Sequence, residues 1–311
     1  LRKQLKKYNI HAPAIDFEEV YREVQKAIAE RKDLLEEQMR CFINTADDYF
    51  EYRIGEAKLL DKYTVEIATP GHKEIVHADH IILATGSKPR YLPELPIDEK
   101  IIMTSDGIEH MSTFPESLVI VGAGVIGCEY ATIFSSFGHT KVYLIDKGAR
   151  ILPFEDEDVV DIIQQNMENN GVVIHHQSKL ADMKIVDGHV EYTIQYDDGT
   201  SETLSVAKAL VSVGRTPNLD NLIPSELGLM MHQRGVENLS TQTNIPNIYA
   251  VGDLTSDISL VNIGELEGRH AVEKIFGRPS RQLVYDNISN IMFLNPEVAS
   301  VGINELQAQA A

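Results

Sequence analysis

One glycine pattern in the sequence has the spacing that suits the phosphates of a dinucleotide: Gly122-Ala123-Gly124-Val125-Ile126-Gly127. An apolar segment precedes it and a helix-like segment follows it. In such a strand, turn and helix, Gly122 permits the tight turn, Gly124 lets the backbone approach a pyrophosphate, and Gly127 allows close packing. The amino end of the helix then faces the phosphates, where unpaired N–H groups favour an anion. Glycine triplets also occur in ordinary tight turns, so the flanking strand and helix carry the assignment.

An acidic residue stands where a dinucleotide site needs one. The strand expected at 141–145 ends in Asp146, whose carboxylate is placed to accept hydrogen bonds from the adenosine ribose and to repel a 2′-phosphate. We therefore expect NAD(H) to be favoured. Lys147 and Arg150 follow directly and offer positive charge to a 2′-phosphate, so NADP(H) stays open. The alternative interpretation of Asp146 is a solvated acid at a strand end.

Two further residues of the glycine segment have simple structural interpretations. Glu129 lies in the first turn of the expected helix, where a carboxylate favours the positive end of the helix dipole. Cys128 has neither a CxxC partner nor a nearby His, so we interpret it as a small packed residue rather than a nucleophile. The other cysteine, Cys41, is far away in the sequence. Neither a disulfide framework nor a zinc site is indicated, and we expect no metal.

The elements that position these residues can be predicted from apolar periodicity and breakers. Asp16 and Glu19 form a capping box that opens a long amphipathic helix to about Met39. Short alternating strands and a buried strand follow it, at 49–54, 63–68, 74–76 and 80–86.

The glycine pattern lies inside one βαβ unit. Its strand is expected at 118–121 and its helix at 125–137, with Gly138 as the stop signal. The rest of this domain is expected to close near 210–214 and to contain a helix at 159–167 and strands at 172–175, 183–186 and 190–196. One more buried strand at 247–253 and one more helix at 260–276 come after it.

Bulk properties limit the classes of function. A chain of 311 residues is long enough for two or more domains, and its 43% hydrophobic and 24% charged residues are ordinary for a globular protein. No apolar run approaches the roughly 18 to 20 residues that a membrane span requires, so we expect no membrane partner. The net charge of -19 opposes a phosphate backbone and disfavours nucleic acid. With so few cysteines, a reducing cytoplasm is the expected location.

Four segments in this order resemble one family, the flavoprotein pyridine nucleotide-disulfide oxidoreductases, which include dihydrolipoamide dehydrogenase, glutathione reductase and soluble pyridine nucleotide transhydrogenase. The segments are Ala84-Thr85-Gly86-Ser87-Lys88-Pro89, the glycine turn through Glu129, Val213-Gly214-Arg215-Thr216-Pro217-Asn218, and Val251-Gly252-Asp253. The resemblance covers nearly the whole chain. Within the family, the stretch from Gly122 to Phe134 is most similar to soluble transhydrogenase.

The resemblance implies an α/β fold with two Rossmann-like dinucleotide-binding domains, in which an NAD(P) domain is inserted into an FAD domain. The implied division is FAD domain 1–112, NAD(P) domain 113–245, FAD domain return 246–285, and the start of a dimerisation domain at 286–311. The residues implied to contact FAD are Ala84, Thr85, Gly86, Gly252, Asp253 at the ribityl chain and Val261 near the isoalloxazine. Those for NAD are Gly122, Gly124, Val125, Ile126, Gly127, Asp146, Lys147, with Glu129, Gly214 and Arg215 at the nicotinamide.

Two family motifs do not occur in this sequence: a second GxGxxG for the FAD pyrophosphate, and a redox-active CxxxxC. We therefore expect the N-terminal FAD half-site and the C-terminal interface domain to be incomplete here, and a homodimer at full length. No residue is assigned as catalytic. The expected function is hydride transfer between nicotinamide cofactors through FAD. The alternatives are a dihydrolipoamide dehydrogenase, which passes electrons from a redox disulfide through FAD to NAD+, and an inactive nucleotide-binding fragment.

Overall fold

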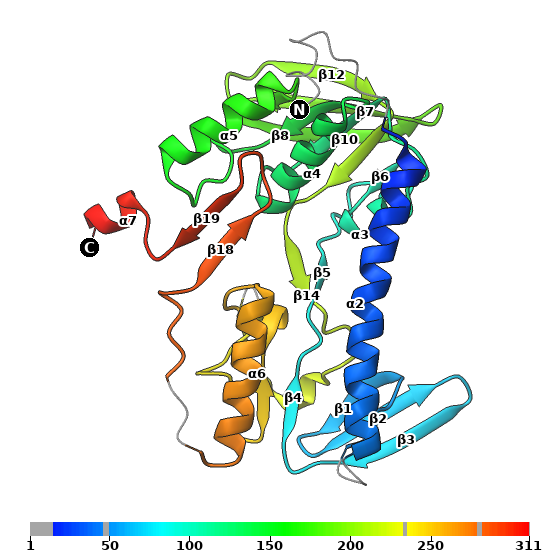
Figure 1. Cartoon of the computed structure of the whole chain (residues 1–311), viewed down its shortest axis with the longest axis vertical. Coiled ribbons are helices and arrows are strands. Elements are labelled where there is room, and N and C mark those ends of the chain that lie inside the picture. The colour runs from blue at the N-terminus through cyan, green and yellow to red at the C-terminus, as the bar shows by residue number, and fades with distance from the viewer. Residues whose placement is uncertain (1–14, 46–49, 233–234, 279–281, 311) are drawn as a thin grey trace.

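The computed structural model describes residues 15–45, 50–232, 235–278 and 282–310. These residues form an α/β structure in two halves (Figure 1). The upper half in this view holds a parallel sheet with helices, and the lower half holds short strands around one helix. Helix α2 (Phe17–Thr45) runs along one side of the molecule. Its amino end is capped by Asp16, whose Oδ1 accepts a hydrogen bond from the Glu18 N–H at 2.9 Å.

The upper half is built on five parallel strands. In spatial order they are β6 (Ile102–Met103), β13 (Lys208–Val211), β7 (Ser117–Val121), β8 (Lys141–Ile145) and β9 (Val173–His175). The short helix α3 (Ser105–Ile108) follows β6, α4 (Val125–Phe137) links β7 to β8, and α5 (Glu157–Asn169) precedes β9. An antiparallel sheet of β10 (Ser178–Val186), β11 (His189–Tyr196) and β12 (Ser201–Val206) completes this half.

Both faces of the parallel sheet are buried. Leu118 and Ile120 of β7 pack into a core with α4 and α5, whereas Val119 and Val121 pack into a second core with the antiparallel sheet. Alternate side chains of a strand point to opposite faces, so burial on both sides requires an uninterrupted apolar run. The sequence of β7 is such a run, and it ends directly at the glycine turn.

The lower half consists of short paired strands. β1 (Glu56–Asp61), β2 (Thr64–Thr69) and β3 (His72–His77) form an antiparallel sheet, and β4 (Ile81–Leu83) pairs in parallel with β17 (Ile248–Ala250). β15 (Met231–His232) pairs with β16 (Gly235–Val236). The remaining elements are the 3-10 turns η1 (Ser225–Leu227) and η2 (Gly252–Leu254) and helix α6 (Val261–Ile275).

One antiparallel strand pair joins the two halves. β5 (Ser87–Pro89) pairs with β14 (Arg215–Pro217), and both run between the halves in Figure 1. The chain ends with the hairpin β18 (Ser289–Met292) and β19 (Val298–Val301) and helix α7 (Glu305–Ala310). Met292 and Leu294 belong to the same core as α4 and α5, so this hairpin packs on the upper half.

Most expected elements are confirmed. The helix at 125–137 and the strand at 141–145 have the expected bounds, and Gly138 ends the helix in the left-handed conformation at φ 72°. The strand expected at 49–54 is wrong: Tyr49 lies outside the described residues, and 50–54 form no strand. The first strand of this sheet is instead β1. Phe50, Tyr52 and Ile54 are all exposed, so the alternating apolar pattern there has no sheet face to cover.

The expected domain bounds stay a prediction, and two packing facts bear on them. β6 pairs with β13 although it precedes residue 113. Leu222 and Ile245 pack with Ile81 and Leu83 of the lower half although both precede residue 246.

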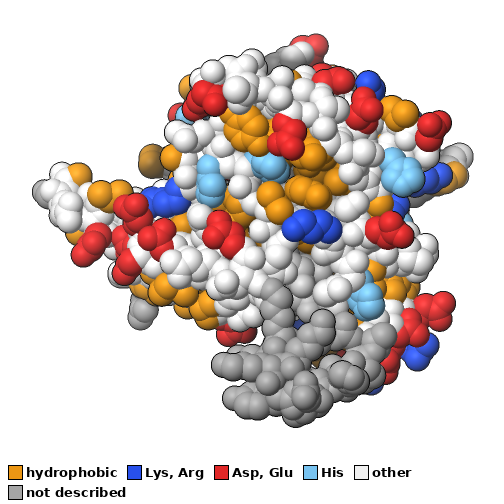
Figure 2. Space-filling model, turned by 90° about the horizontal axis from the view of Figure 1, so that it is seen from above, with side chains coloured by type: hydrophobic (Ala, Val, Ile, Leu, Met, Phe, Trp, Pro, Cys, Tyr) orange, Lys and Arg blue, Asp and Glu red, His pale blue; other side chains and the backbone are white. Residues whose placement is uncertain are grey.

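Among the described residues, no helix combines the length and the apolar character needed to cross a membrane. Within the same ranges, no group of three or more His, Cys, Asp or Glu side chains is arranged to hold a metal ion. Figure 2 shows the molecule from above, where Lys and Arg side chains are scattered singly among acidic and apolar ones rather than gathered into a patch.

Candidate dinucleotide-binding site

The glycine turn has a geometry that only glycine satisfies at two of its three positions. Gly122 adopts φ 102°, and a Cβ there would lie 2.6 Å from the Ser212 carbonyl oxygen. At Gly127 a Cβ would lie 1.9 Å from the Gly122 carbonyl oxygen. Gly124 differs, because its backbone is extended and no atom lies within 4 Å of a Cβ position. Gly122 and Gly127 close the turn, and Gly124 leaves open space beside the start of α4.

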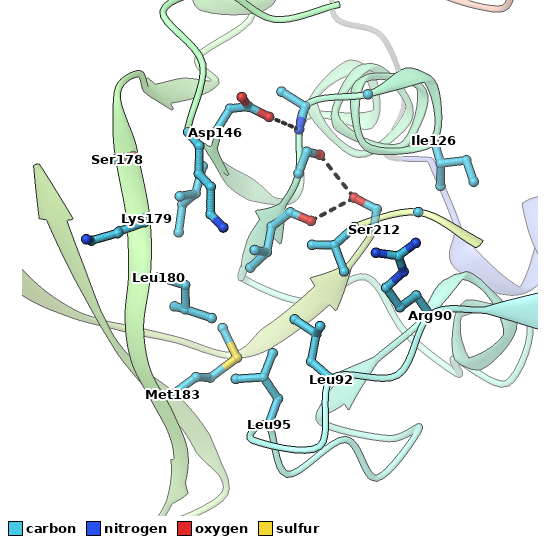
Figure 3. Close-up of a pocket in the computed structure, with 18 of the residues that line it drawn as sticks. Arg90, Leu92, Leu95, Ile126, Asp146, Ser178, Lys179, Leu180, Met183 and Ser212 are labelled. Atoms are coloured by element: carbon cyan, nitrogen blue, oxygen red, sulfur yellow. Dashed lines mark hydrogen bonds between the residues drawn. The ribbon is translucent and has the colours of Figure 1, made fainter. Parts of the chain in front are cut away.

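That open space belongs to a cavity of about 750 Å³ at the carboxyl ends of β7, β8 and β13 (Figure 3). This is the edge at which open α/β sheets bind ligands. Seven expected residues line it: Gly122, Gly124, Val125, Ile126, Asp146, Lys147 and Gly214. Three expected residues, Gly127, Glu129 and Arg215, are not part of the lining.

Asp146 stabilises the glycine turn through its carboxylate. Its Oδ2 accepts a hydrogen bond from the Ala123 N–H at 2.8 Å, and its Oδ1 accepts one from the Gly148 N–H at 2.6 Å. Both carboxylate oxygens are therefore engaged by backbone, although each retains capacity for a further bond. The contact with a ribose that the sequence predicts stays a prediction.

The three cations near Asp146 differ in what they contact. Lys147 and Lys179 line the cavity, and Figure 3 shows Lys179 at the side of β10 with its amine directed away from the centre. Arg150 is engaged elsewhere: its Nη1 lies 3.7 Å from a carboxylate oxygen of Glu157, and its Nη2 donates to the Glu155 carbonyl oxygen. The positive charge available to a 2′-phosphate is therefore that of Lys147 rather than Arg150.

Sequence reasoning missed several lining residues. Ser212 Oγ donates toward the carbonyl oxygens of Val121 and Gly122, at 3.0 Å each, and so fixes the beginning of the turn. Part of the cavity wall is apolar, as expected for a site that holds flat ring systems. Five of the apolar lining residues come from segments that carry no motif, and they are Leu92, Leu95, Leu180, Ala181 and Met183.

Glu129 and Cys128 lie behind the turn. Glu129 Oε1 accepts a hydrogen bond from the Phe293 N–H at 2.9 Å, which ties α4 to the carboxyl-terminal hairpin. Its expected contact with nicotinamide stays a prediction. Burial, with the charges of Asp146 and Glu129 contributing, raises the pKa of the Cys128 thiol to about 12. Cys128 is therefore a protonated, packed side chain, as the sequence indicates.

A second polar cluster links the strand pair β5 and β14 to Asp253 of the lower half. Ser87 Oγ donates to Asp253 Oδ2 at 2.9 Å, and the same hydroxyl accepts a hydrogen bond from Arg215 Nε at 2.7 Å. Arg215 Nη2 also donates to the Ser87 carbonyl oxygen at 2.8 Å. The side chain of Arg215 thus belongs to this cluster. Thr85 is exposed and donates to the Asn218 carbonyl oxygen.

Helix α6 places one buried carboxylate beside this cluster. Glu267 is 1% exposed, and it accepts hydrogen bonds from the Gly252 N–H at 2.6 Å and from the Tyr285 hydroxyl at 2.8 Å. Burial raises the pKa of Glu267 against the lowering effect of those two donors. At the start of α6, Val261 is 83% exposed and no side chain caps the helix. The first two residues of α6, Val261 and Asn262, are both exposed, and no side-chain cap engages their N–H groups.

Comparisons with known proteins agree with this arrangement. The model of the pyridine nucleotide-disulphide oxidoreductase family matches residues 8–268. Dihydrolipoyl dehydrogenase of Bacillus subtilis is 35% identical over 261 residues, which cover 82% of this chain and 55% of that protein. Soluble pyridine nucleotide transhydrogenase of Pseudomonas paraeruginosa is 34% identical over 260 residues, with 83% and 55% covered. Glutathione reductase of Nostoc is 34% identical over 268 residues, with 82% and 56% covered.

Solved structures show the same fold. LpdA of Mycobacterium tuberculosis matches with a TM-score of 0.86 at 23% identity, over 99% of this chain and 66% of that one. The flavoprotein disulfide reductase RclA of Escherichia coli, as its Cu(II) complex, matches with a TM-score of 0.82 at 24% identity, over 96% and 66%. Of the curated relatives, 55% or 56% of the length is covered, so the chain spans about half the length of the curated relatives it matches.

Proposed function

The chain belongs to the pyridine nucleotide-disulphide oxidoreductase family, and on this basis we propose that it binds FAD and a nicotinamide dinucleotide and transfers hydride between nicotinamide dinucleotides. Members of this family use FAD together with NAD(H) or NADP(H). The observation that carries the proposal is the open Cβ position of Gly124, which faces a cavity that also holds Asp146 and Gly214. A pyrophosphate fits where a side chain at Gly124 would stand.

The residues of the chain have distinct roles in this proposal. The N–H groups at the start of α4 and the glycine backbone bind the pyrophosphate, while Asp146 orients the adenosine ribose. The apolar wall formed by Leu92, Leu95 and Met183 excludes water from the bound rings. Gly214, at φ 107°, allows the backbone to approach the nicotinamide end closely.

The lower half fits part of an FAD molecule. Asp253 presents a carboxylate held by Ser87, Gly252 is held by Glu267, and the uncapped start of α6 offers N–H groups to an acceptor. These residues would hold the ribityl and ring portions. The chain contains one GxGxxG turn, which the dinucleotide occupies, so the FAD pyrophosphate has no equivalent turn in this sequence. When bound, FAD supplies the chemistry of accepting a hydride from a reduced nicotinamide and returning it to an oxidised one.

The stretch from Gly122 to Phe134 supports hydride exchange between nicotinamides over dihydrolipoamide oxidation, because it is most similar to soluble transhydrogenase. Dihydrolipoamide oxidation needs in addition a pair of cysteines that can form a disulfide and exchange electrons with the flavin. The third candidate, an inactive nucleotide-binding fragment, keeps the cavity but does not hold FAD.

The test is a binding titration followed by a reaction. The chain is titrated with NADH and with FAD, using thermal stabilisation and flavin fluorescence as readouts, because a ligand that binds the folded state raises its stability. The flavin-loaded chain is then mixed with NADPH and an oxidised nicotinamide analogue, or with dihydrolipoamide and NAD+. Reduction of the analogue supports the proposal, and reaction with dihydrolipoamide alone supports the rival enzyme. NADH binding without flavin binding supports the inactive module. The homodimer that the resemblance implies stays a prediction, which light scattering tests.

A further inference from the structure

One cation reaches the cavity from the segment that joins the two halves. Arg90 directly follows β5, and its N–H donates to the Gly214 carbonyl oxygen at 3.0 Å, which extends the ladder between β5 and β14 by one bond. The backbone pairing therefore fixes the position of Arg90 at the cavity wall. Figure 3 shows its guanidinium directed toward Ser212 and Ile126, across the cavity from Asp146.

The guanidinium of Arg90 has no hydrogen-bond or ion-pair partner among the residues that the structure describes. Arg90 differs in this respect from Arg150 and Arg215. Arg150 pairs with Glu157, and Arg215 donates to Ser87. Guanidinium carries five N–H donors in a planar fork and stays charged at every physiological pH. Arg90 thus presents an unused, anion-binding group to the cavity.

The anion that best matches this group is a phosphate. Arginine pairs with phosphate oxygens through two parallel hydrogen bonds, which give both affinity and orientation. Gly124 leaves room for a pyrophosphate at the start of α4, in the cavity that Asp146 and Arg90 also line. If Asp146 marks the adenosine side, the phosphate nearest to Arg90 is the second one, which carries the nicotinamide ribose.

We propose that Arg90 binds the nicotinamide-side phosphate of the dinucleotide in this cavity. The proposal rests on the proposed function and adds a residue to it that lies outside the glycine turn and outside the upper half. Glu94 lines the same cavity and carries the opposite charge. Because the two side chains come from the same loop, they form a natural pair for testing the effect of charge on phosphate binding.

The test is the affinity of the Arg90→Ala variant for a series of shortened ligands. AMP has the adenosine-side phosphate alone, whereas ADP, ADP-ribose and NADH also contain the second phosphate. The dissociation constants of the last three should rise about tenfold or more, as expected for losing charge-assisted hydrogen bonds. The dissociation constant of AMP should stay within about twofold of that of the unchanged chain, because no bond to its phosphate is lost. Arg90→Lys should fall between, since lysine keeps the charge without the fork.

Controls separate binding from folding and from bulk charge. Arg31 is an exposed arginine of α2 outside the cavity, so Arg31→Ala removes the same charge and should leave NADH affinity unchanged. Glu94→Gln should tighten NADH, because it removes a negative charge from the same wall. The thermal midpoint of Arg90→Ala without ligand should match that of the unchanged chain, because the exposed guanidinium makes no hydrogen bond or ion pair with the described residues.

Two results would overturn the proposal while leaving the proposed function intact. The first is an Arg90→Ala variant that binds NADH and ADP-ribose as tightly as the unchanged chain. The second is an equal loss of affinity for AMP and NADH, which would show that Arg90 acts on the turn as a whole. If the unchanged chain binds no NADH, the proposed function fails, and the role of Arg90 fails with it.

Discussion

Alanine substitutions at Gly127 and at Gly124 should have different effects: the first should lower the stability of the fold, and the second should weaken NADH binding. At Gly127 the new methyl group would lie 1.9 Å from the Gly122 carbonyl oxygen and 2.9 Å from Ser212 Oγ. Real Cβ contacts rarely fall below 3.0 Å, and the closest atom is backbone, so the turn must move. Forcing a turn or core apart by roughly 1 Å is a case of overpacking, which costs about 1–3 kcal/mol.

At Gly124 the expected outcome is the reverse. Its backbone at φ -78° and ψ -171° suits any residue, and no atom lies within 4 Å of the added methyl. Alanine also reduces the conformational entropy of the unfolded chain, which stabilises by about 0.4–1 kcal/mol at compatible positions. The methyl group nevertheless occupies the space through which a pyrophosphate would approach. Gly124→Ala should therefore fold at least as stably as the unchanged chain and bind NADH much more weakly.

The assay measures the thermal midpoint by scanning calorimetry and the NADH dissociation constant by fluorescence, for both variants and for the unchanged chain. Gly127→Ala should lower the midpoint by several degrees. Gly171→Ala is unsuitable as a control because Gly171 has φ 91°, whereas Gly268 on α6 has open space at its Cβ position and a helical backbone. Gly268→Ala should change neither readout adversely. Undiminished NADH affinity in Gly124→Ala, or an unchanged midpoint in Gly127→Ala, would refute this account of the turn.

Three further outcomes are expected. Asp146→Ala leaves the N–H groups of Ala123 and Gly148 without their acceptor, so it should lower the free energy of unfolding by about 1 kcal/mol and weaken NADH binding; a chemical denaturation curve and a titration measure the two effects. Ser87→Ala removes the hydroxyl that binds Asp253 and Arg215 Nε, so FAD affinity should fall in a flavin titration while NADH affinity stays the same. Burial raises the folded-state pKa of Glu267, so the folded chain holds this proton more tightly than the unfolded one. Stability should then fall as pH rises from the ordinary carboxyl value near 4.5 through the raised value, and Glu267→Gln should flatten that slope in denaturation curves taken across pH.

The upper half could be predicted closely because local signals and burial agree there. β7 is apolar from Leu118 to Val121, Gly138 has the left-handed conformation that a helix stop requires, and the helix between them begins at the glycine turn. Each signal acts within a few residues. Asp146 could be predicted for the same reason, because it directly follows β8, the next strand after the glycine turn.

The rest of the site depends on contacts between distant parts of the chain. Arg90, Leu92 and Ser212 line the same cavity as the glycine turn only because β5 pairs with β14 and β13 lies beside β7. No periodicity in the sequence records such a pairing. The partner of Glu129 is likewise a backbone N–H at Phe293, for which the sequence carries no side-chain signal at all. The error at 50–54 has a related cause, because an alternating pattern states which side chains could be buried but not whether a neighbouring strand exists.

The ladder of β5 and β14 also has a mechanical consequence. Arg90 and Gly214 are joined by a backbone hydrogen bond at its end, so a rotation of one half relative to the other would move them together. One side of the cavity is the glycine turn, which directly follows a strand of the parallel sheet. The other side is formed by Arg90 and Gly214 at the end of this ladder. A dinucleotide bound both to the glycine turn and to Arg90 would connect these two parts of the chain. It would couple the orientation of the halves to the occupancy of the cavity, so that ligand binding and interdomain stiffness rise together.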